Sequence, residues 1–360
     1  MNFRVKPLLF CGLLLIGSIR WSTAQEVVSG IFGFNKLTLI GGSDTFVSLP
    51  FARLPDSTVL VSSTSSSNII QVQGTPGWTN NQFVYAVGAQ SNSYYVRIES
   101  GALEGRYFNV TSNTTNTLTV DLNGGSLAGL TFSNQVSVIP HWTLASVFGS
   151  EGNGIVLSTS TTLRKTEVLV PSFNGTGINL SAATTYFYYT NAGSVNWRRV
   201  GASTNCNDDI IRPNGYLLIR HKAGPNTTFV SLGDVILTKV NIPLVVNASN
   251  KQDNFVSMPR PLDLSLNDSG LIASGAFVPS TSTTLRKDEL LVFDNAATNV
   301  NKSAASTFFY FTGSSSWRKV GLTNDYGTSN IFQPGSGFII RKAASAVIPV
   351  WTNSPTYTNN

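Results

Sequence analysis

Apolar residues along most of this chain are gathered in short runs that end at polar turns. Runs of about four to eight residues, rich in Val, Ile, Phe and Tyr, are closed by Gly, Asn or Pro, a pattern typical of β-strands. Helical periodicity does not extend beyond one or two turns, and segment 142–148 comes nearest to it. The pattern therefore predicts an all-β protein.

A long block of sequence occurs twice. Residues 158–170 return as 280–292 with eleven of the thirteen positions identical. Shorter matches accompany this block: 44–50 returns as 253–259, 186–190 as 308–312, 197–201 as 317–321, and 213–220 as 334–341. We therefore expect two tandem copies of a β-sandwich-like unit, formed by duplication.

The spacing of the matches predicts a third module inside the first copy. Pro50 precedes Ser158 by 108 positions, whereas the equivalent Pro259 precedes Ser280 by only 21. Six short runs fill the extra length and predict a small β-barrel or sandwich: 69–73, 83–87, 94–99, 106–110, 117–122 and 136–139. The expected organisation is a first repeat at 25–65 and 142–235, an inserted domain at 66–141, and a second repeat at 236–360.

The N-terminal residues predict export. Arg4 and Lys6 precede an apolar run at 8–19, and Ser22 and Ala24 then form a small-residue cleavage pattern. The run is shorter than the roughly 20 residues that cross a bilayer. We therefore expect residues 1–24 to be a cleaved signal peptide, and the mature chain to have no membrane span and to act outside the cell, at its surface or in the periplasm.

Charge and cysteine content change once the leader is set aside. The full chain has 24 basic and 18 acidic side chains. Removing Arg4, Lys6 and Arg20 leaves 21 against 18, or +3, which is too small an excess to predict a nucleic-acid partner. Cys11 is also removed, so that Cys206 has no partner for an intramolecular disulfide.

Several segments together resemble a known family. Residues 94–101, 105–108, 116–120 and 139–144, with the Phe-Val-Ser-Leu-Pro at 46–50, resemble a family of uncharacterised exported proteins from Verrucomicrobia. The resemblance covers nearly the whole mature chain. It implies a bacterial, exported protein and assigns no catalytic residue.

The strongest candidate for ligand binding is a tryptophan followed by two basic residues, at equivalent places in both copies. These residues are Trp197, Arg198 and Arg199, and Trp317, Arg318 and Lys319. An exposed tryptophan can stack on a sugar while an adjacent arginine binds hydroxyl or anionic groups. Alternatively the tryptophan closes the core and the basic side chains reach out to solvent. We favour the core interpretation.

Paired carboxylates are the candidates for catalysis, because glycosidases use two of them. Glu167 and Glu289 occupy equivalent positions in the two copies. An active site seldom occurs twice in one chain, so we expect ion pairs with the nearby Arg164 and Arg286 on exposed strand faces. Neither His141 nor His221 has an equivalent in the other copy, and no nucleophile motif surrounds a serine.

Acidic loops are the candidates for a metal site. Asp208 and Asp209 share one Asn-rich loop, and Asp325 lies in its counterpart. Oxygen ligands suit Ca²⁺, but the alternating spacing of a calcium loop is missing. Asn and Asp also form turns by themselves. We therefore expect neither a metal nor another cofactor.

The leading hypothesis is an exported, non-enzymatic protein of the cell surface or envelope, acting as a structural component or an interaction module. Its partners would be polysaccharides or other envelope proteins. A carbohydrate-binding protein that uses the Trp-Arg positions is the first alternative. The second is a hydrolase acting on polysaccharides through Glu167, Glu289 or the loop at Asp208 and Asp209.

Overall fold

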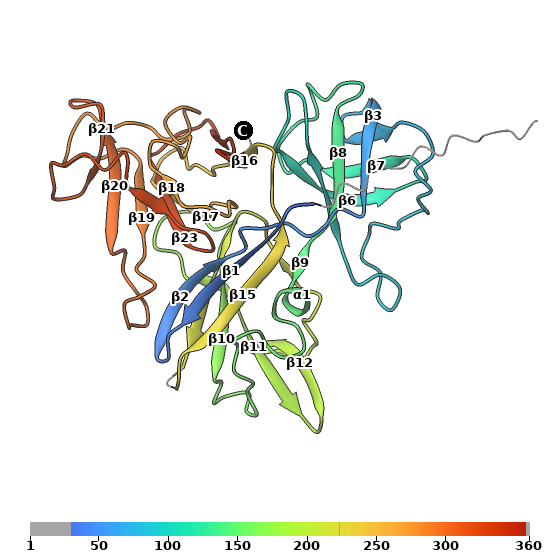
Figure 1. Cartoon of the computed structure of the whole chain (residues 1–360), viewed down its shortest axis with the longest axis horizontal. Helices are drawn as coiled ribbons and strands as arrows, with labels where there is room; N and C mark the ends of the chain where they lie inside the picture. The colour runs from blue at the N-terminus through green and yellow to red at the C-terminus, as the bar shows by residue number, and fades with distance from the viewer. Residues whose placement is uncertain (1–29, 223, 358–360) are drawn as a thin grey trace, which may run out of the picture. The chain divides into compact units, whose positions relative to one another are not determined.

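Strands and their connecting loops make up almost all of the computed structural model, which describes residues 30–222 and 224–357 (Figure 1). Within these residues the only α-helix is α1 (Leu144–Phe148). The predicted all-β fold is therefore correct. The predicted leader, residues 1–24, lies outside the described residues. No helix in the described part of the chain is long and apolar enough to cross a membrane.

The first repeat is built around a five-stranded antiparallel sheet. Its order is β12 (Ser194–Arg199), β11 (Ala182–Asn191), β10 (Thr166–Pro171), β14 (Tyr216–His221), β2 (Ser43–Ser48). Two two-stranded sheets complete the repeat: β1 (Phe32–Leu39) with β15 (Thr227–Asp234), and β9 (Trp142–Thr143) with β13 (Ile210–Ile211). Side chains from the five-stranded sheet, both two-stranded sheets and α1 form one apolar core, as in a sandwich.

The second repeat has the same strand order. Its sheet runs β21 (Ser316–Lys319), β20 (Ser306–Phe311), β19 (Glu289–Val292), β23 (Gly337–Lys342), β17 (Gln252–Ser257). The two-stranded sheets are β16 (Val240–Pro243) with β24 (Val350–Asn353), and β18 (Leu264–Ser265) with β22 (Asn330–Phe332). Both repeats also contain an isolated parallel β-bridge, which joins Ser158 to Tyr189 in the first repeat and Ser280 to Phe311 in the second.

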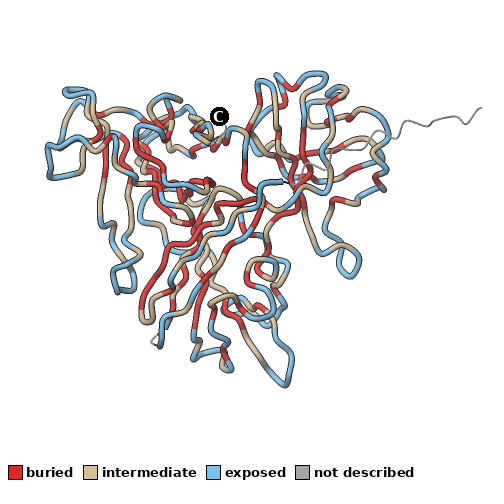
Figure 2. The backbone as a smooth tube through the Cα atoms, viewed as in Figure 1, coloured by how far each residue is buried: buried red, intermediate tan, exposed pale blue. Residues whose placement is uncertain are grey.

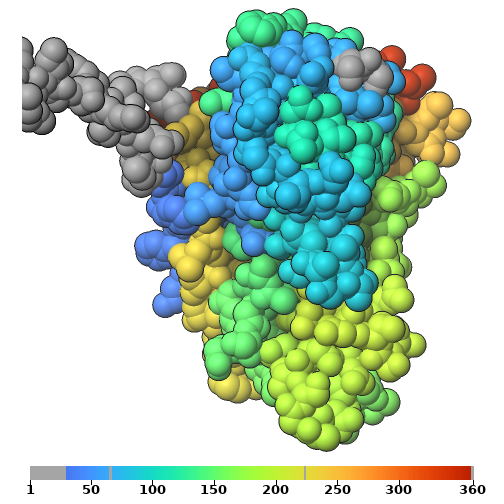
Figure 3. Space-filling view, turned by 90° about the vertical axis from the view of Figure 1, so that its right-hand side faces the viewer, coloured from blue at the N-terminus to red at the C-terminus, as the bar shows by residue number. Residues whose placement is uncertain are grey.

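The inserted module is a closed six-stranded barrel (Figure 1). Its order is β3 (Ser57–Ser66), β4 (Ile69–Val72), β7 (Thr117–Asp121), β6 (Tyr107–Asn113), β5 (Tyr94–Ile98), β8 (Gln135–Pro140). Alternate side chains of these strands fill the barrel with its own core. Part of the outer surface of the barrel faces the viewer in Figure 3.

Two expectations about the barrel were wrong. It starts at Ser57 and not at residue 66, because the Ser- and Thr-rich second half of β3 has the composition of a loop and yet pairs with β4. Segment 83–87 is not a strand. Its apolar residue Phe83 is fully buried in the barrel core, and the Phe83 N–H donates to Asn113 Oδ1 at 3.0 Å.

The two repeats pack against each other through β2 and β17, which are buried along their whole length on both faces (Figure 2). Val47 belongs to the core of the first repeat, whereas its neighbour Phe46 belongs to a separate apolar cluster between the repeats. Tyr216 and Phe255 share this cluster. Each repeat therefore has its own core, and a further apolar cluster joins them.

Polar contacts at this interface are reciprocal. Arg220 of the first repeat pairs with Asp44 at 2.8 Å, and Asn301 of the second repeat donates its N–H to Asp44 at 2.7 Å. The equivalent Arg341 pairs with Asp253 at 2.7 Å, and Asn179 of the first repeat donates its N–H to Asp253 at 2.7 Å. An interface in which each half makes the same contacts is the arrangement of a twofold-symmetric dimer, here within one chain.

Candidate functional site

Trp197 and Trp317 are both only 1% exposed. Trp197 packs on Phe148 with ring centroids 4.9 Å apart, and Trp317 packs on Phe277 at 5.0 Å. A buried ring has no face free for a sugar, so the proposed stacking on Trp197 and Trp317 is wrong and the core interpretation is correct. Tryptophan is large and apolar, and here it is part of the core of each repeat.

The basic residues that follow these tryptophans are nearer the surface. Arg198 lies over the ring of Tyr189 at 4.4 Å, and Arg318 lies over Phe311 at 4.6 Å, as cation–π pairs. Arg199 is exposed. Lys319 is half-buried. Arg198 and Arg318 therefore follow a buried tryptophan in the sequence, but they do not stack on it. The ring that each arginine contacts, Tyr189 or Phe311, belongs to the neighbouring strand.

The carboxylates make the expected ion pairs, in more buried places than expected. Glu167 pairs with Arg164 at 2.5 Å, and Glu289 pairs with Arg286 at 2.8 Å. Both glutamates are buried, at 6% and 7% exposure, and not on exposed faces. Burial by itself raises the pKa of Glu289, but hydrogen bonds from Lys251 and Arg286 outweigh it and lower that pKa. The two glutamates lie in different sheets, each in its own ion-pair cluster.

The acidic loops contain turn and packing contacts. Asp209 accepts a hydrogen bond from the Tyr186 hydroxyl at 2.7 Å, and Asp325 accepts one from the Gly327 N–H at 2.8 Å. Asp208 is exposed. Among the described residues no group of three or more His, Cys, Asp or Glu side chains is placed to hold a metal ion. These contacts are those of turn-forming aspartates.

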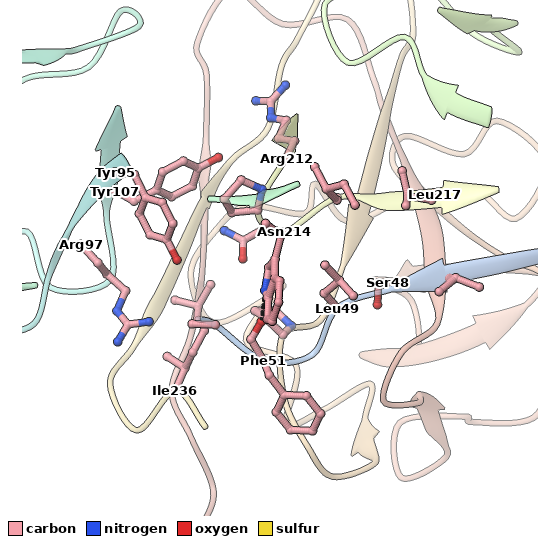
Figure 4. Close-up of a pocket in the computed structure, with 18 of the residues that line it drawn as sticks. Ser48, Leu49, Phe51, Tyr95, Arg97, Tyr107, Arg212, Asn214, Leu217 and Ile236 are labelled. Atoms are coloured by element: carbon pink, nitrogen blue, oxygen red, sulfur yellow. Dashed lines mark hydrogen bonds between the residues drawn. The ribbon is translucent and has the colours of Figure 1, made fainter. Parts of the chain in front are cut away.

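A pocket that the sequence did not reveal lies where the barrel meets both repeats (Figure 4). We call it the junction pocket. The barrel contributes Tyr95, Arg97 and Tyr107, which lie on one side. Arg212 and Asn214, from the loop before β14, lie across from them. Its empty volume is about 750 Å³ when the open solvent at its mouth is included.

Phe51 and Trp142 lie on the two segments that join the barrel to the first repeat, and both line this pocket. They are held together because the Trp142 indole N–H donates to the Phe51 carbonyl at 3.1 Å. Ile236, from the segment between the repeats, completes the apolar side. The pocket therefore depends on the fold of all three modules.

The charged side chains that line the junction pocket, Arg97 and Arg212, are both donors. Burial raises the pKa of Tyr95 to about 12, so that its phenol stays protonated near neutral pH. Arg97 Nε pairs with Glu99 at 2.9 Å, whereas its buried Nη1 has no hydrogen-bond partner within the described residues. A buried guanidinium nitrogen without an acceptor is costly, and an anionic ligand would satisfy it.

Local sequence contains part of the signal for this pocket. Tyr94, Val96 and Ile98 alternate into the barrel core, so Tyr95 and Arg97 must point outward from the barrel. An aromatic residue and an arginine two positions apart on the outer face of a strand are a recognisable feature. What covers that face is set by segments far away in the sequence.

We compared the chain with known protein families, with curated proteins and with solved structures. None of these comparisons found a match.

Proposed function

We propose that this chain is an exported, non-enzymatic binding protein of the cell surface or envelope, and that the junction pocket holds its ligand. The observation that carries the proposal is the lining of that pocket, in which aromatic rings and hydrogen-bond donors come from the barrel and the first repeat, and apolar side chains come from the second repeat. No carboxylate, histidine or cysteine is among its described lining residues. Such a lining supports binding, because a hydrolase needs a group that accepts and returns a proton.

The lining favours a ligand with a ring-shaped body and an anionic group. Tyr107, which is half-buried, offers a ring surface and a hydroxyl group, an arrangement common in sites for sugars. Arg97 and Arg212 offer guanidinium groups, which bind carboxylates in a fixed geometry. An acidic sugar residue of an extracellular polysaccharide combines both features. The sugar would therefore bind in the junction pocket, and not at the buried tryptophans.

Position on rigid elements also supports binding. Tyr95 and Arg97 lie on β5, whose neighbours β6 and β8 close the barrel. The segment after the first repeat is fixed to the barrel by Lys239 and Thr238, which contact Glu104 at 3.3 Å and Glu99 at 3.0 Å. A site held in this way loses little conformational entropy when its ligand binds.

The test is a binding assay on an array of acidic and neutral polysaccharide fragments. We expect acidic fragments to bind, and Arg212→Ala to weaken that binding about tenfold through the loss of a charged hydrogen bond. Arg212 is exposed, so its removal leaves the core intact. Arg318→Ala is the matched control, because Arg318 lies on the second repeat over Phe311. Equal binding of acidic and neutral fragments, or no effect of Arg212→Ala, would contradict the proposal.

A further inference from the structure

Asp288 and Lys342 face each other inside the core of the second repeat. Strand β19 begins at Glu289, which pairs with Arg341 of β23, so the preceding Asp288 lies directly opposite Lys342. Their side chains are 0% and 1% exposed. The residues that follow on the same face of the two strands are Leu290 and Ile340, both completely buried.

The two side chains are in direct contact and are positioned by backbone groups. Lys342 Nζ contacts Asp288 Oδ2 and donates to the Ala276 carbonyl. The Asp288 carboxyl group accepts backbone N–H bonds from Val278 and Ala343, each at 2.7 Å. An amine and a carboxyl carbon are therefore held together, while two N–H donors polarise the carboxyl group as an oxyanion site would.

Keeping this pair as ions is expensive. Two charges removed from water lose several kcal/mol of hydration each, and a buried ion pair often recovers less than that. Condensation to an amide removes both charges and leaves one N–H and one C=O group. Both have partners at this place, since Ala276 accepts a hydrogen bond and the N–H of Val278 or Ala343 donates one.

We propose that Lys342 and Asp288 join in an intramolecular isopeptide bond. A proton passes from the Lys342 ammonium to the Asp288 carboxylate, and the Nζ lone pair attacks Cγ to form the N–C bond. A second Nζ proton moves to one carboxyl oxygen, the bond between Cγ and that oxygen breaks, and one water leaves. The product keeps a single Nζ–H, and no oxidant or other reactant takes part.

The first repeat provides an internal comparison. Thr166 and His221 occupy the equivalent facing positions, and the Thr166 hydroxyl contacts His221 Nδ1 at 2.9 Å. A hydroxyl group and an imidazole do not condense to an amide. The proposed bond is therefore confined to the second repeat, where it closes a loop over 54 positions in a chain whose only described cysteine, Cys206, is free.

Peptide mapping of the denatured wild-type chain tests the bond. Trypsin cleaves after Lys287 and Lys302 and after Arg341, and it cannot cleave after an acylated Lys342. We expect one branched peptide that joins 288–302 to 342–360 and is lighter than the two together by one water. Separate linear peptides 288–302 and 343–360 in the wild-type digest would overturn the proposal.

Two comparisons make the result specific. Lys342→Arg keeps the positive charge but has no amine that can form this amide, and its digest should contain only linear peptides. Glu289, in the same peptide as Asp288, pairs at 2.8 Å with Lys251, which is 37% exposed at its side chain. Fragmentation of the branched peptide should place the bond on Asp288. A bond on Glu289, or a branched peptide in Lys342→Arg, would contradict the assignment.

Discussion

The two repeats have the same strand order, and they differ at a few buried positions inside or beside closely matched segments. At the end of the equivalent strand pair, the first repeat holds Thr166 and His221, and the second holds Asp288 and Lys342. Both pairs are buried opposite each other in the same register. The comparison teaches that the strand pattern determines the framework, whereas the chemistry of a buried pair can change inside it.

A second difference lies at the interface between the repeats. Tyr216 and Gly337 are equivalent positions, and in a near-twofold arrangement equivalent positions meet at the axis. A Cβ atom on Gly337 would lie 2.3 Å from Cγ of Tyr216. Two tyrosines cannot occupy this place together. One large and one small residue solve the problem, so the duplicated halves are complementary and not identical.

A third difference is the connection after the first sheet strand. In the first repeat the chain leaves at Phe51 for the barrel and returns at Trp142. In the second, the short connection places Arg260 at 2% exposure, where it donates to the Ile236 carbonyl and to Asn353 Oδ1, both at 2.8 Å. Arg260 thus stabilises the short connection of the second repeat, at the place where the first repeat contains the barrel instead.

Substitutions in the two buried pairs should give the largest difference in the free energy of unfolding between the repeats. Lys342→Ala should lower the free energy of unfolding by ~3–5 kcal/mol, because it removes the bond to Asp288 and leaves that carboxyl group buried without a partner. His221→Ala should cost ~1–3 kcal/mol, since the orphaned Thr166 hydroxyl is neutral. Denaturant unfolding followed by tryptophan fluorescence measures both. Equal losses would show that the difference between the two buried pairs has no energetic consequence.

Gly337→Ala should cost about 3 kcal/mol, at the upper end for an overpacked site, because the new methyl group collides with the Tyr216 ring. Thermal unfolding of the single variant and of Gly337→Ala with Tyr216→Ser gives the coupling between the two positions. We expect the double variant to recover part of the loss from Gly337→Ala. Additive losses would contradict a direct collision at the interface.

Acid should destabilise the barrel connection of the first repeat. Burial lowers the pKa of His141 from 6.5 to about 4, and its Nε2 lies 3.0 Å from Asn109 Oδ1. Below pH 6.5 the unfolded chain binds a proton that the folded chain refuses, so this stability is complete above 6.5 and falls as the pH falls. We expect a loss of roughly 2 kcal/mol by about pH 5, measured by denaturant unfolding at each pH.

The control for this pH dependence is His141→Gln, which cannot take up the proton. Its free energy of unfolding should change less between pH 6.5 and about pH 5 than that of the wild type. His141 lies at the end of the barrel and has no equivalent in the second repeat. An unchanged acid dependence in His141→Gln would assign the effect to other groups.

Some features of the structure were readable from the sequence because they depend on near neighbours along the chain. The strands and their turns follow from alternation and from Gly, Asn and Pro. The ion pairs Arg164–Glu167 and Arg286–Glu289 follow from residues three apart. The serine-rich half of β3 was missed because its composition resembles a loop, and only pairing with β4 makes it a strand.

Other features were decided only by tertiary structure. Strand alternation shows that two residues share a face, but it does not show which segment covers that face. Burial of Trp197 and Trp317, the junction pocket beside Tyr95, and the contact between Asp288 and Lys342 all depend on segments far apart in the chain. The sequence by itself determined the strands and their repetition, and long-range packing decided which side chains meet.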